Sequence, residues 1–208
     1  IVVAWPDRAD SLSVEITNSC GNYTLHHQIW TPGRQYPYPD PDDTRILPNT
    51  IDPTHYDYGG EGVAYHDWNT VNMGQGVRQD EGVDTQLEDQ GHGSISWIND
   101  GEWVEYTFRV EQETSAKVIL RMASAEQTDG YVDVLINDEK AISGLQAENT
   151  GKWTRYEGFE SSPITLSPAD SVLRLEFHGS NFNLGRIIFS RMETGIQEER
   201  NGPSFHTF

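Results

Sequence analysis

The chain has 208 residues, which is enough for one well-cored domain with an appendage. Its 33 acidic and 14 basic residues give a formal net charge of −19, which repels phosphate backbones and anionic membrane surfaces and argues against nucleic acid as a partner. No apolar run reaches the roughly 18 residues that a membrane span needs, so no membrane partner is expected. Neutral ligands are favoured, because a sulfated or uronate polymer is also repelled unless Arg78, Arg155 or Arg186 forms a local basic spot.

The chain contains one cysteine, Cys20, so it has no intrachain disulfide and its fold must rest on its core or on a metal ion. It begins at Ile1 without a methionine or a basic and apolar leader. We therefore expect a mature protein or an excised fragment, whose targeting signal is not visible.

Residues 1–46 differ from the rest of the chain. Short strand-like runs at 1–5, 12–16 and 23–30 are followed by a stretch interrupted by several prolines. Three short strands do not bury a useful core alone. We predict an N-terminal extension that packs on the main domain or is left from a preceding domain.

The main domain is predicted over residues 47–192, with 193–208 as a C-terminal tail or linker. It contains about eight short strand-like runs separated by turn signals, and it shows no helical period. This pattern predicts an all-β fold, a two-sheet antiparallel β-sandwich. The runs lie at 103–110, 116–123, 130–136, 141–142, 153–159, 164–166, 171–177 and 184–189.

The stretch 96–108 carries the clearest strand signal. After the turn at Asn99-Asp100-Gly101, the residues at 103, 105 and 107 alternate with the apolar residues at 104, 106 and 108, which is typical of a half-buried strand. Trp97 precedes this turn. Its indole is expected either to fold into the core or to meet a flat ligand, and the stretch alone favours neither.

No catalytic motif is present: the chain lacks a Gly-x-Ser-x-Gly elbow, a His-Glu-x-x-His pair, a phosphate-binding loop and a cysteine pair for zinc. Glu102 and Glu105 could be considered as a glycosidase pair. Residues three apart on a strand point to opposite faces, so these two are better interpreted as solvated charges or as ligands of a structural ion.

The remaining signal is a set of aromatic and amide residues in predicted loops. Trp97 and Trp153 are accompanied by Asn181 and Asn183, and the turn-rich, acidic stretch 80–84 adds Glu81. A sugar ring stacks its apolar C–H face on an indole, while its hydroxyls bond to amides and carboxylates. The alternative is that Trp153 belongs to the core and Asn183 only closes a turn.

Several ordered segments resemble the family 6 carbohydrate-binding modules. The resemblance covers about residues 47–190. Its segments are Ile51 to Asp57, Tyr56 to Asp67, Trp97 to Tyr106, Leu120 to Ser124, Thr150 to Thr154 and Asn181 to Phe189.

The resemblance implies a lectin-like jelly roll and a noncatalytic module that anchors a polysaccharide-degrading enzyme to its substrate. In the family's main site two aromatics clamp a terminal sugar and an asparagine bonds its hydroxyls; these positions are Trp97, Trp153 and Asn183 here. A second cleft on a sheet face uses an aromatic that matches Trp103 and a glutamate for which Glu61 is an approximate match.

The family also has a structural calcium site, at which this sequence departs from the family pattern. The two acidic or amide ligands of the first strand are replaced by Asp52 and Thr54, and the ligand two residues after Asn183 is Gly185. Calcium prefers six to eight oxygens, so Asp52 is the remaining candidate ligand of a depleted site.

The sequence thus predicts a monomeric, noncatalytic module, secreted or on a bacterial cell surface. It would bind a neutral polysaccharide, with agarose-type galactan favoured and β-1,3-glucan (laminarin) or xylan as alternatives, and would target an attached glycoside hydrolase or polysaccharide lyase. An alternative of another class is a structural accessory sandwich within a larger enzyme.

Overall fold

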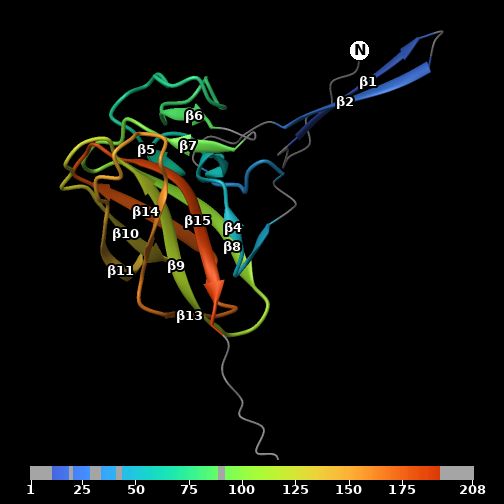
Figure 1. The fold of residues 1–208 in the computed structure, drawn as a ribbon. Helices are drawn as coiled ribbons and strands as arrows, with labels where there is room; N and C mark the ends of the chain where they lie inside the picture. Colours follow the sequence, from blue (N-terminus) through green and yellow to red (C-terminus); the bar gives the residue numbers. More distant parts are fainter. Residues whose placement is uncertain (1–10, 19–20, 29–33, 41–43, 89–91, 193–208) are drawn as a thin grey trace, which may run out of the picture.

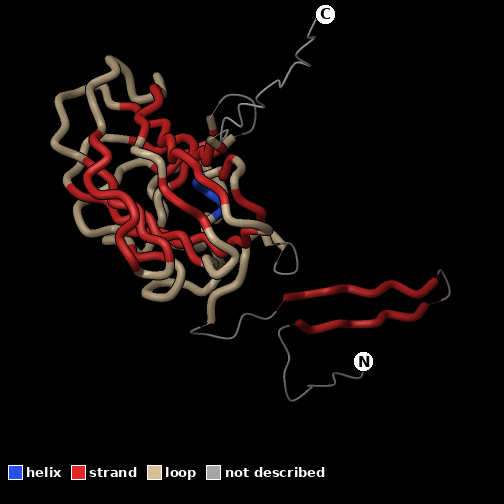
Figure 2. Tube along the Cα trace, turned by 90° about the horizontal axis from the view of Figure 1, so that it is seen from below, coloured by secondary structure: helices blue, strands red, loops and turns tan. Residues whose placement is uncertain are grey.

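The computed structural model describes residues 11–18, 21–28, 34–40, 44–88 and 92–192. Two packed sheets form a sandwich, and β1 (Ser11–Asn18) and β2 (Gly21–Gln28) form a separate antiparallel hairpin (Figure 1). One short helical element lies among the strands, the 3₁₀ turn η1 (Pro53–His55) (Figure 2). None of the helices in these ranges has the length and hydropathy to cross a membrane. The predicted all-β sandwich is confirmed.

The first sheet has six strands. Its order is β11, β10, β14, β8, β3, and β5 also pairs with β8. The strands are β3 (Arg45–Leu47), β5 (Tyr65–His66), β8 (Trp103–Val110), β10 (Tyr131–Ile136), β11 (Glu139–Gln146) and β14 (Val172–His178). Its pairs are antiparallel except β3 with β8, where Arg45 lies opposite Phe108 in a parallel register.

The second sheet has seven strands. Its order is β12, β9, β15, β7, β6, while β13 pairs with β9 and β4 pairs with β15. The strands are β4 (Thr50–Ile51), β6 (Thr85–Leu87), β7 (Gly93–Ile95), β9 (Thr114–Ala123), β12 (Glu157–Glu160), β13 (Ile164–Leu166) and β15 (Asn183–Arg191).

The predicted strand at 153–159 is partly wrong, because β12 begins only at Glu157. Gly151 adopts a left-handed φ of +86°, and the Arg155 amide donates to the Lys152 carbonyl at 3.2 Å. These features form a turn that contains Trp153. The alternation of side chains from residue 153 onward therefore predicted a strand that begins too early, because the backbone still forms a turn at these residues.

The core lies between the two sheets and is built from every second residue of the long strands. On β8 the inward residues Val104, Tyr106 and Phe108 are each at most 1% exposed, as the alternation predicted. β9, β14 and β15 contribute equally buried side chains: Val118, Leu120, Met122, Leu173, Leu175, Phe177, Leu184, Ile187 and Phe189. This burial stabilises the sandwich and directs the alternate residues of each strand outward.

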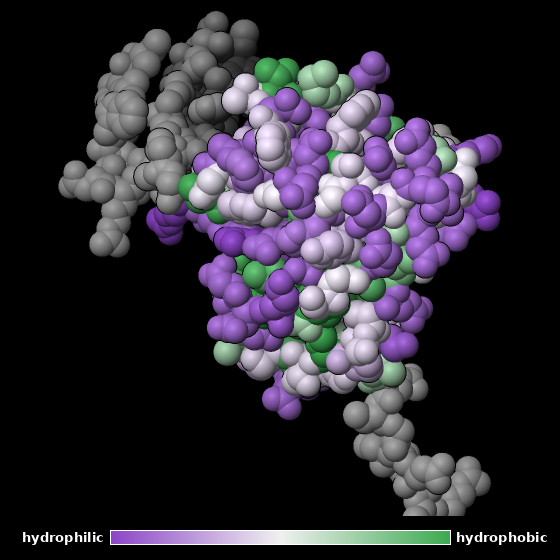
Figure 3. Space-filling view, turned by 90° about the vertical axis from the view of Figure 1, so that its left-hand side faces the viewer, coloured by the Kyte–Doolittle hydropathy of each residue, from purple (hydrophilic) through white to green (hydrophobic). Residues whose placement is uncertain are grey.

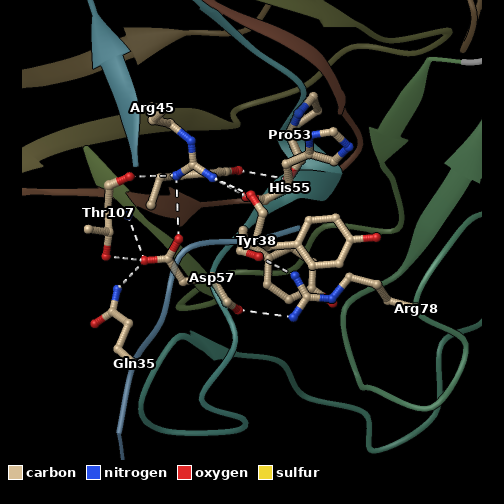
Figure 4. Close-up of polar contacts among 10 residues, drawn as sticks. Gln35, Tyr38, Arg45, Pro53, His55, Asp57, Arg78 and Thr107 are labelled. Carbon is tan, nitrogen blue, oxygen red and sulfur yellow. Dashed lines mark hydrogen bonds and ion pairs between the residues drawn. The ribbon is translucent and has the colours of Figure 1, made fainter. Parts of the chain in front are cut away.

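The buried carboxylate of Asp57 contacts two residues from the start of the chain, Gln35 and Arg45 (Figure 4). Asp57 is fully buried, and its Oδ2 accepts hydrogen bonds from Gln35 Nε2 at 2.9 Å and from the Thr107 amide at 2.6 Å. Its Oδ1 lies 3.4 Å from Nη1 of Arg45. Burial raises the pKa of Asp57, while the bonds from Thr107 and the charge of Arg45 oppose that rise.

Arg45 completes this connection through carbonyl groups. Its guanidinium donates to the carbonyls of Thr107 at 2.9 Å, Tyr38 at 3.0 Å and His55 at 2.9 Å (Figure 4). Tyr36 also bridges to Tyr58 through two backbone hydrogen bonds. Residues 34–38 thus contact the sandwich directly, and β3 is one of the strands of its first sheet.

The division of the chain into extension, sandwich and tail stays a prediction. The predicted strand at 1–5 and the tail at 193–208 lie outside the described residues.

We expect Asp57→Asn to lower the free energy of unfolding by about 3–5 kcal/mol, because it leaves the largely buried Arg45 guanidinium without its counter-charge. The measurement is urea unfolding of the intact chain. Glu111→Gln is the control, since this exposed carboxylate pairs with Arg109 at the surface. Equal midpoints for the two variants would show that the buried pair adds no net stability.

Candidate ligand-binding site

A cavity of about 510 Å³ lies at the edge of the sandwich where three loops meet. Trp97 and Asn99 come from the loop between β7 and β8, and Trp153 comes from the turn before β12. Asn181 and Asn183 come from the junction of β14 and β15. The structure thus brings four predicted site residues, two tryptophans and two asparagines, into one cavity.

Trp97 is held outward by its backbone. Its φ of +51° is in the left-handed region, which is unusual for a bulky side chain, and its side chain remains 53% exposed. The Asn99 side-chain amide donates to the Trp97 carbonyl at 2.9 Å. Of the two possibilities for this indole, core packing and ligand contact, the geometry excludes core packing.

Trp153 and Asn183 are connected to each other. The Asn183 side-chain amide donates to the Trp153 carbonyl at 3.0 Å, so the first residue of β15 fixes the turn that carries the indole. Trp153 is 39% exposed and is therefore not a core residue. The carbonyl of an asparagine side chain is the kind of acceptor that a ligand hydroxyl can bond to.

A second cavity of about 770 Å³ adjoins the first, and Glu88 and Thr154 line both. Arg121 and Arg186 face each other across β9 and β15 and both line this second cavity. Arg186 thus contributes to a basic spot. The other two arginines considered from the sequence do not, because Arg78 is 4% exposed beneath Tyr56 and Arg155 pairs with Glu157 at 3.0 Å.

Three further predicted residues lie outside the loop-edge cavity. Glu81 forms an ion pair with Arg78 at 2.9 Å. Trp103 lies on the outer face of β8, where the Arg174 guanidinium is 4.5 Å from its ring. Glu61 is near that face, because its carboxylate contacts His66, the residue opposite Trp103. Their proposed role in binding stays a prediction.

Trp68, which was not among the predicted site residues, is 71% exposed. Its indole Nε1 donates to the Asp100 carbonyl at 2.9 Å, so it contacts the same turn that carries Trp97. The signal available in the sequence is its position at the end of a long stretch, 59–68, that is rich in glycine, aromatic and acidic residues, a composition typical of functional loops.

Hydrogen bonds to a buried carboxylate, that of Glu102, hold the turn before β8. Glu102 is 4% exposed and accepts hydrogen bonds from the Asn99 amide at 2.8 Å, the Asn99 side chain at 3.1 Å and the Trp68 amide at 3.3 Å. Glu105 is equally buried and pairs with Arg174 at 2.5 Å. The interpretation of these glutamates as solvated charges is wrong, because loop and strand neighbours cover both. The other interpretation, that they are ligands of a structural ion, stays a prediction.

Glu102 is one of three buried carboxylates in this region. Asp67 is 8% exposed and Asp84 is 1% exposed. Burial raises the pKa of all three, and it raises that of Asp67 to about 7, with the charges of Glu102 and Asp84 adding to the effect. These three carboxylates therefore repel one another when they are ionised.

The residues at the family's calcium position do not fit a calcium ion. Both oxygens of Asp52 accept hydrogen bonds, Oδ1 from the Thr54 amide at 3.0 Å and Oδ2 from the Gly93 amide at 3.1 Å. Arg186 Nη1 lies 3.8 Å from Asp52 Oδ2 and donates to the carbonyl of Gly185 at 2.7 Å and that of Gly93 at 3.5 Å. A guanidinium therefore lies among the oxygens that a metal would need.

Asp133, Glu176 and His178 form another group with metal-ligand atoms within 4.8 Å of one another. They lie on the outer face of the first sheet, where Lys140 forms an ion pair with Asp133 and Arg174 Nη1 lies 3.7 Å from Glu176. Side-chain cations already balance these carboxylates.

Comparison with known proteins identifies the family. The family model described as carbohydrate binding module (family 6) matches residues 59–191, well over half of the chain.

Solved structures show the same fold at low identity. A family 6 module from Clostridium stercorarium, solved with cellobiose, has 15% identity and a TM-score of 0.55 and covers 72% of this chain and 98% of its own. A β-1,3-glucan-binding module from Bacillus halodurans has 21% identity and a TM-score of 0.52, with coverages of 71% and 99%. The C-terminal module of a marine laminarinase from Zobellia galactanivorans has 18% identity and a TM-score of 0.51, with coverages of 68% and 97%.

The cavity with its two exposed indoles and the match over 59–191 lead to one conclusion: the chain belongs to the family 6 carbohydrate-binding modules, a family of noncatalytic binding modules.

Proposed function

We propose that this module binds a neutral polysaccharide, an agarose-type galactan in the first place, in the cavity between Trp97 and Trp153. The observation that carries the proposal is the convergence of two exposed indoles and the Asn183 amide in one cavity of about 510 Å³. The indoles stack on the apolar faces of sugar rings, and the amides bond to hydroxyls. Binding would place an attached hydrolase or lyase, secreted or on the cell surface, next to its substrate.

A β-1,3-glucan is the second candidate ligand. Two structures with this fold, those from Bacillus halodurans and Zobellia galactanivorans, are a β-1,3-glucan-binding module and a module of a laminarinase. Xylan is the third candidate.

A structural accessory role within a larger enzyme is the alternative of another class, and it requires that the exposed indoles be covered by a catalytic domain.

Affinity electrophoresis of the intact chain through gels with agarose, laminarin, xylan or no polymer tests the proposal. Retardation by agarose supports it, while retardation by laminarin or xylan moves the function to that glycan. Equal migration in all gels contradicts glycan binding and favours the accessory role.

Replacing the indole of Trp153 is expected to weaken binding of the retarding glycan by at least about 30-fold, the size typical of a central binding residue. Since Trp153 is 39% exposed, the melting temperature of Trp153→Ala should stay close to that of the wild type. Titration by tryptophan fluorescence and a melting curve measure the two quantities. A large fall in melting temperature with unchanged affinity would contradict the assignment.

Trp68 is expected to contact longer ligands that extend across the Asn99–Gly101 turn. Trp68→Ala should therefore lower affinity for a hexasaccharide by about three- to tenfold while leaving that for a disaccharide unchanged. Val71→Ala is the matched control, because Val71 is 62% exposed on the same loop. The same loss at both chain lengths, or with the control, would exclude a separate contact.

We also propose that Arg186 takes the stabilising place of the family's calcium ion. Arg186→Met should lower the free energy of unfolding by about 1–3 kcal/mol, since the carbonyls of Gly185 and Gly93 lose a charged donor. The loss should be equal in calcium and in a chelator, as measured by urea unfolding. Arg109→Met, at an exposed pair, serves as the control. A loss that calcium restores would show that the site does bind the ion.

A further inference from the structure

The cavity of about 770 Å³ beside the binding site has a basic lining, although the chain as a whole is strongly acidic. Arg121 and Arg186 line it together with the exposed imidazole of His92, and it is called the arginine cavity below. The two arginines are directly opposite each other on β9 and β15. Like charges in such a cross-strand pair destabilise a sheet, so this pair favours a negative group beside it.

A β-bulge turns Arg186 toward the arginine cavity. The pairing of β15 with β9 shifts between Leu184 and Arg186, and the fully buried residues Leu184 and Ile187 are three positions apart. In a regular strand Arg186 would share the inward face with Leu184. The extra residue, Gly185, places its side chain on the outer face with Arg121 instead. Bulges re-aim side chains in this way and are common beside functional sites.

Gly185 also gives the cavity its shape. A Cβ at this position would lie 2.6 Å from Cδ1 of Tyr156, so glycine is what lets that ring lie against the strand. The Tyr156 hydroxyl donates to Glu88 Oε1 at 2.7 Å, and both residues line the arginine cavity. Glu88 and Thr154 also line the cavity of the two indoles. The two cavities are therefore continuous, with the Glu88 carboxylate at their junction.

Charge is distributed unevenly along this continuous surface. Arg121 has no carboxylate within 4.0 Å in the described ranges, and its Nη2 donates to the Tyr156 carbonyl. Arg186 has Asp52 Oδ2 3.8 Å from its Nη1, and the same nitrogen donates to two carbonyls. The remaining guanidinium nitrogens of both arginines have no partner among the described residues. An anion is thus disfavoured beside Glu88 and favoured beside the arginines.

We propose that the arginine cavity binds an acidic substituent, a sulfate ester or a carboxylate, of a glycan whose neutral sugars occupy the indole cavity. Guanidinium groups bind such oxyanions through charged and often paired hydrogen bonds. Arg186 is on the order of 10 Å from Asn183 along β15, so a glycan of a few sugars extends over both cavities. The inference rests on the proposed function, and it adds that the polysaccharide carries acidic groups at intervals.

The test compares hexasaccharides of agarose, laminarin and xylan in neutral, lightly sulfated and lightly carboxymethylated forms. Each is titrated into the intact chain, with tryptophan fluorescence as the signal. At about 50 mM NaCl an acidic form of the bound glycan should bind roughly tenfold more tightly than its neutral form. At about 500 mM NaCl this gain should largely disappear, while the affinity for the neutral form stays the same. The better of the two acidic forms identifies the substituent.

Arg121→Met tests the cavity without touching the indoles or Arg186. It should abolish the gain for the acidic form and leave the affinity for the neutral form unchanged. Arg121→Lys should keep part of the gain, because the ammonium group retains the charge but not the planar set of donors. Lys117→Met is the matched control, since it removes the same charge from the same strand at a side chain that pairs with Glu160 outside the cavity. It should keep the full gain.

The outcomes separate this inference from the proposed function. Equal or weaker binding of both acidic forms, with the neutral form still bound, would overturn the inference alone. A gain that Arg121→Met retains, or that Lys117→Met also loses, would overturn it as well. Binding of an acidic form alone would support the arginine cavity and contradict a neutral ligand. If no form of any glycan binds, both proposals are wrong.

Discussion

The sandwich depends on the apolar contact between its two sheets. Inward residues of β8, β9, β14 and β15 are almost completely buried, so a shift of one residue in any of these strands would move its apolar side chains into water. That constraint fixes the register of the strands, and with it the points at which their loops leave the sandwich. The cavity of Trp97 and Trp153 lies at such a point, where loops from both sheets meet at one edge.

Buried charges connect the loops to this framework. Asp57 contacts Arg45 of β3 and Gln35 at the sheet edge. Arg78 lies under Tyr56 and donates to the carbonyl of Asp57 at 3.0 Å (Figure 4). The face of the molecule seen in Figure 3 is mostly hydrophilic, with small apolar patches between polar side chains. Exposed indoles on such a surface are therefore exceptional and indicate a ligand-binding role.

The net charge of −19 does not describe the charge at every point of the molecule. Arg121 and Arg186 line the cavity that adjoins the one between Trp97 and Trp153, whereas Asp67, Asp84 and Glu102 form an acidic group under the neighbouring turn. Screening limits the reach of each charge to about 8 Å at physiological ionic strength. Ligand selection therefore depends on these local groups more than on the total charge.

The sequence by itself determined the β-sandwich, the inward face of β8 and four residues of the cavity, because alternation along a strand and the order of motifs are local properties. Tertiary structure decided the rest. It alone showed that residues 153–156 turn, that Glu102 and Glu105 are buried, and that Glu81 pairs with Arg78. It also placed Arg186 beside Asp52 and Trp68 beside Asp100, because partners that far apart in the chain meet only when β4 pairs with β15 and β5 pairs with β8.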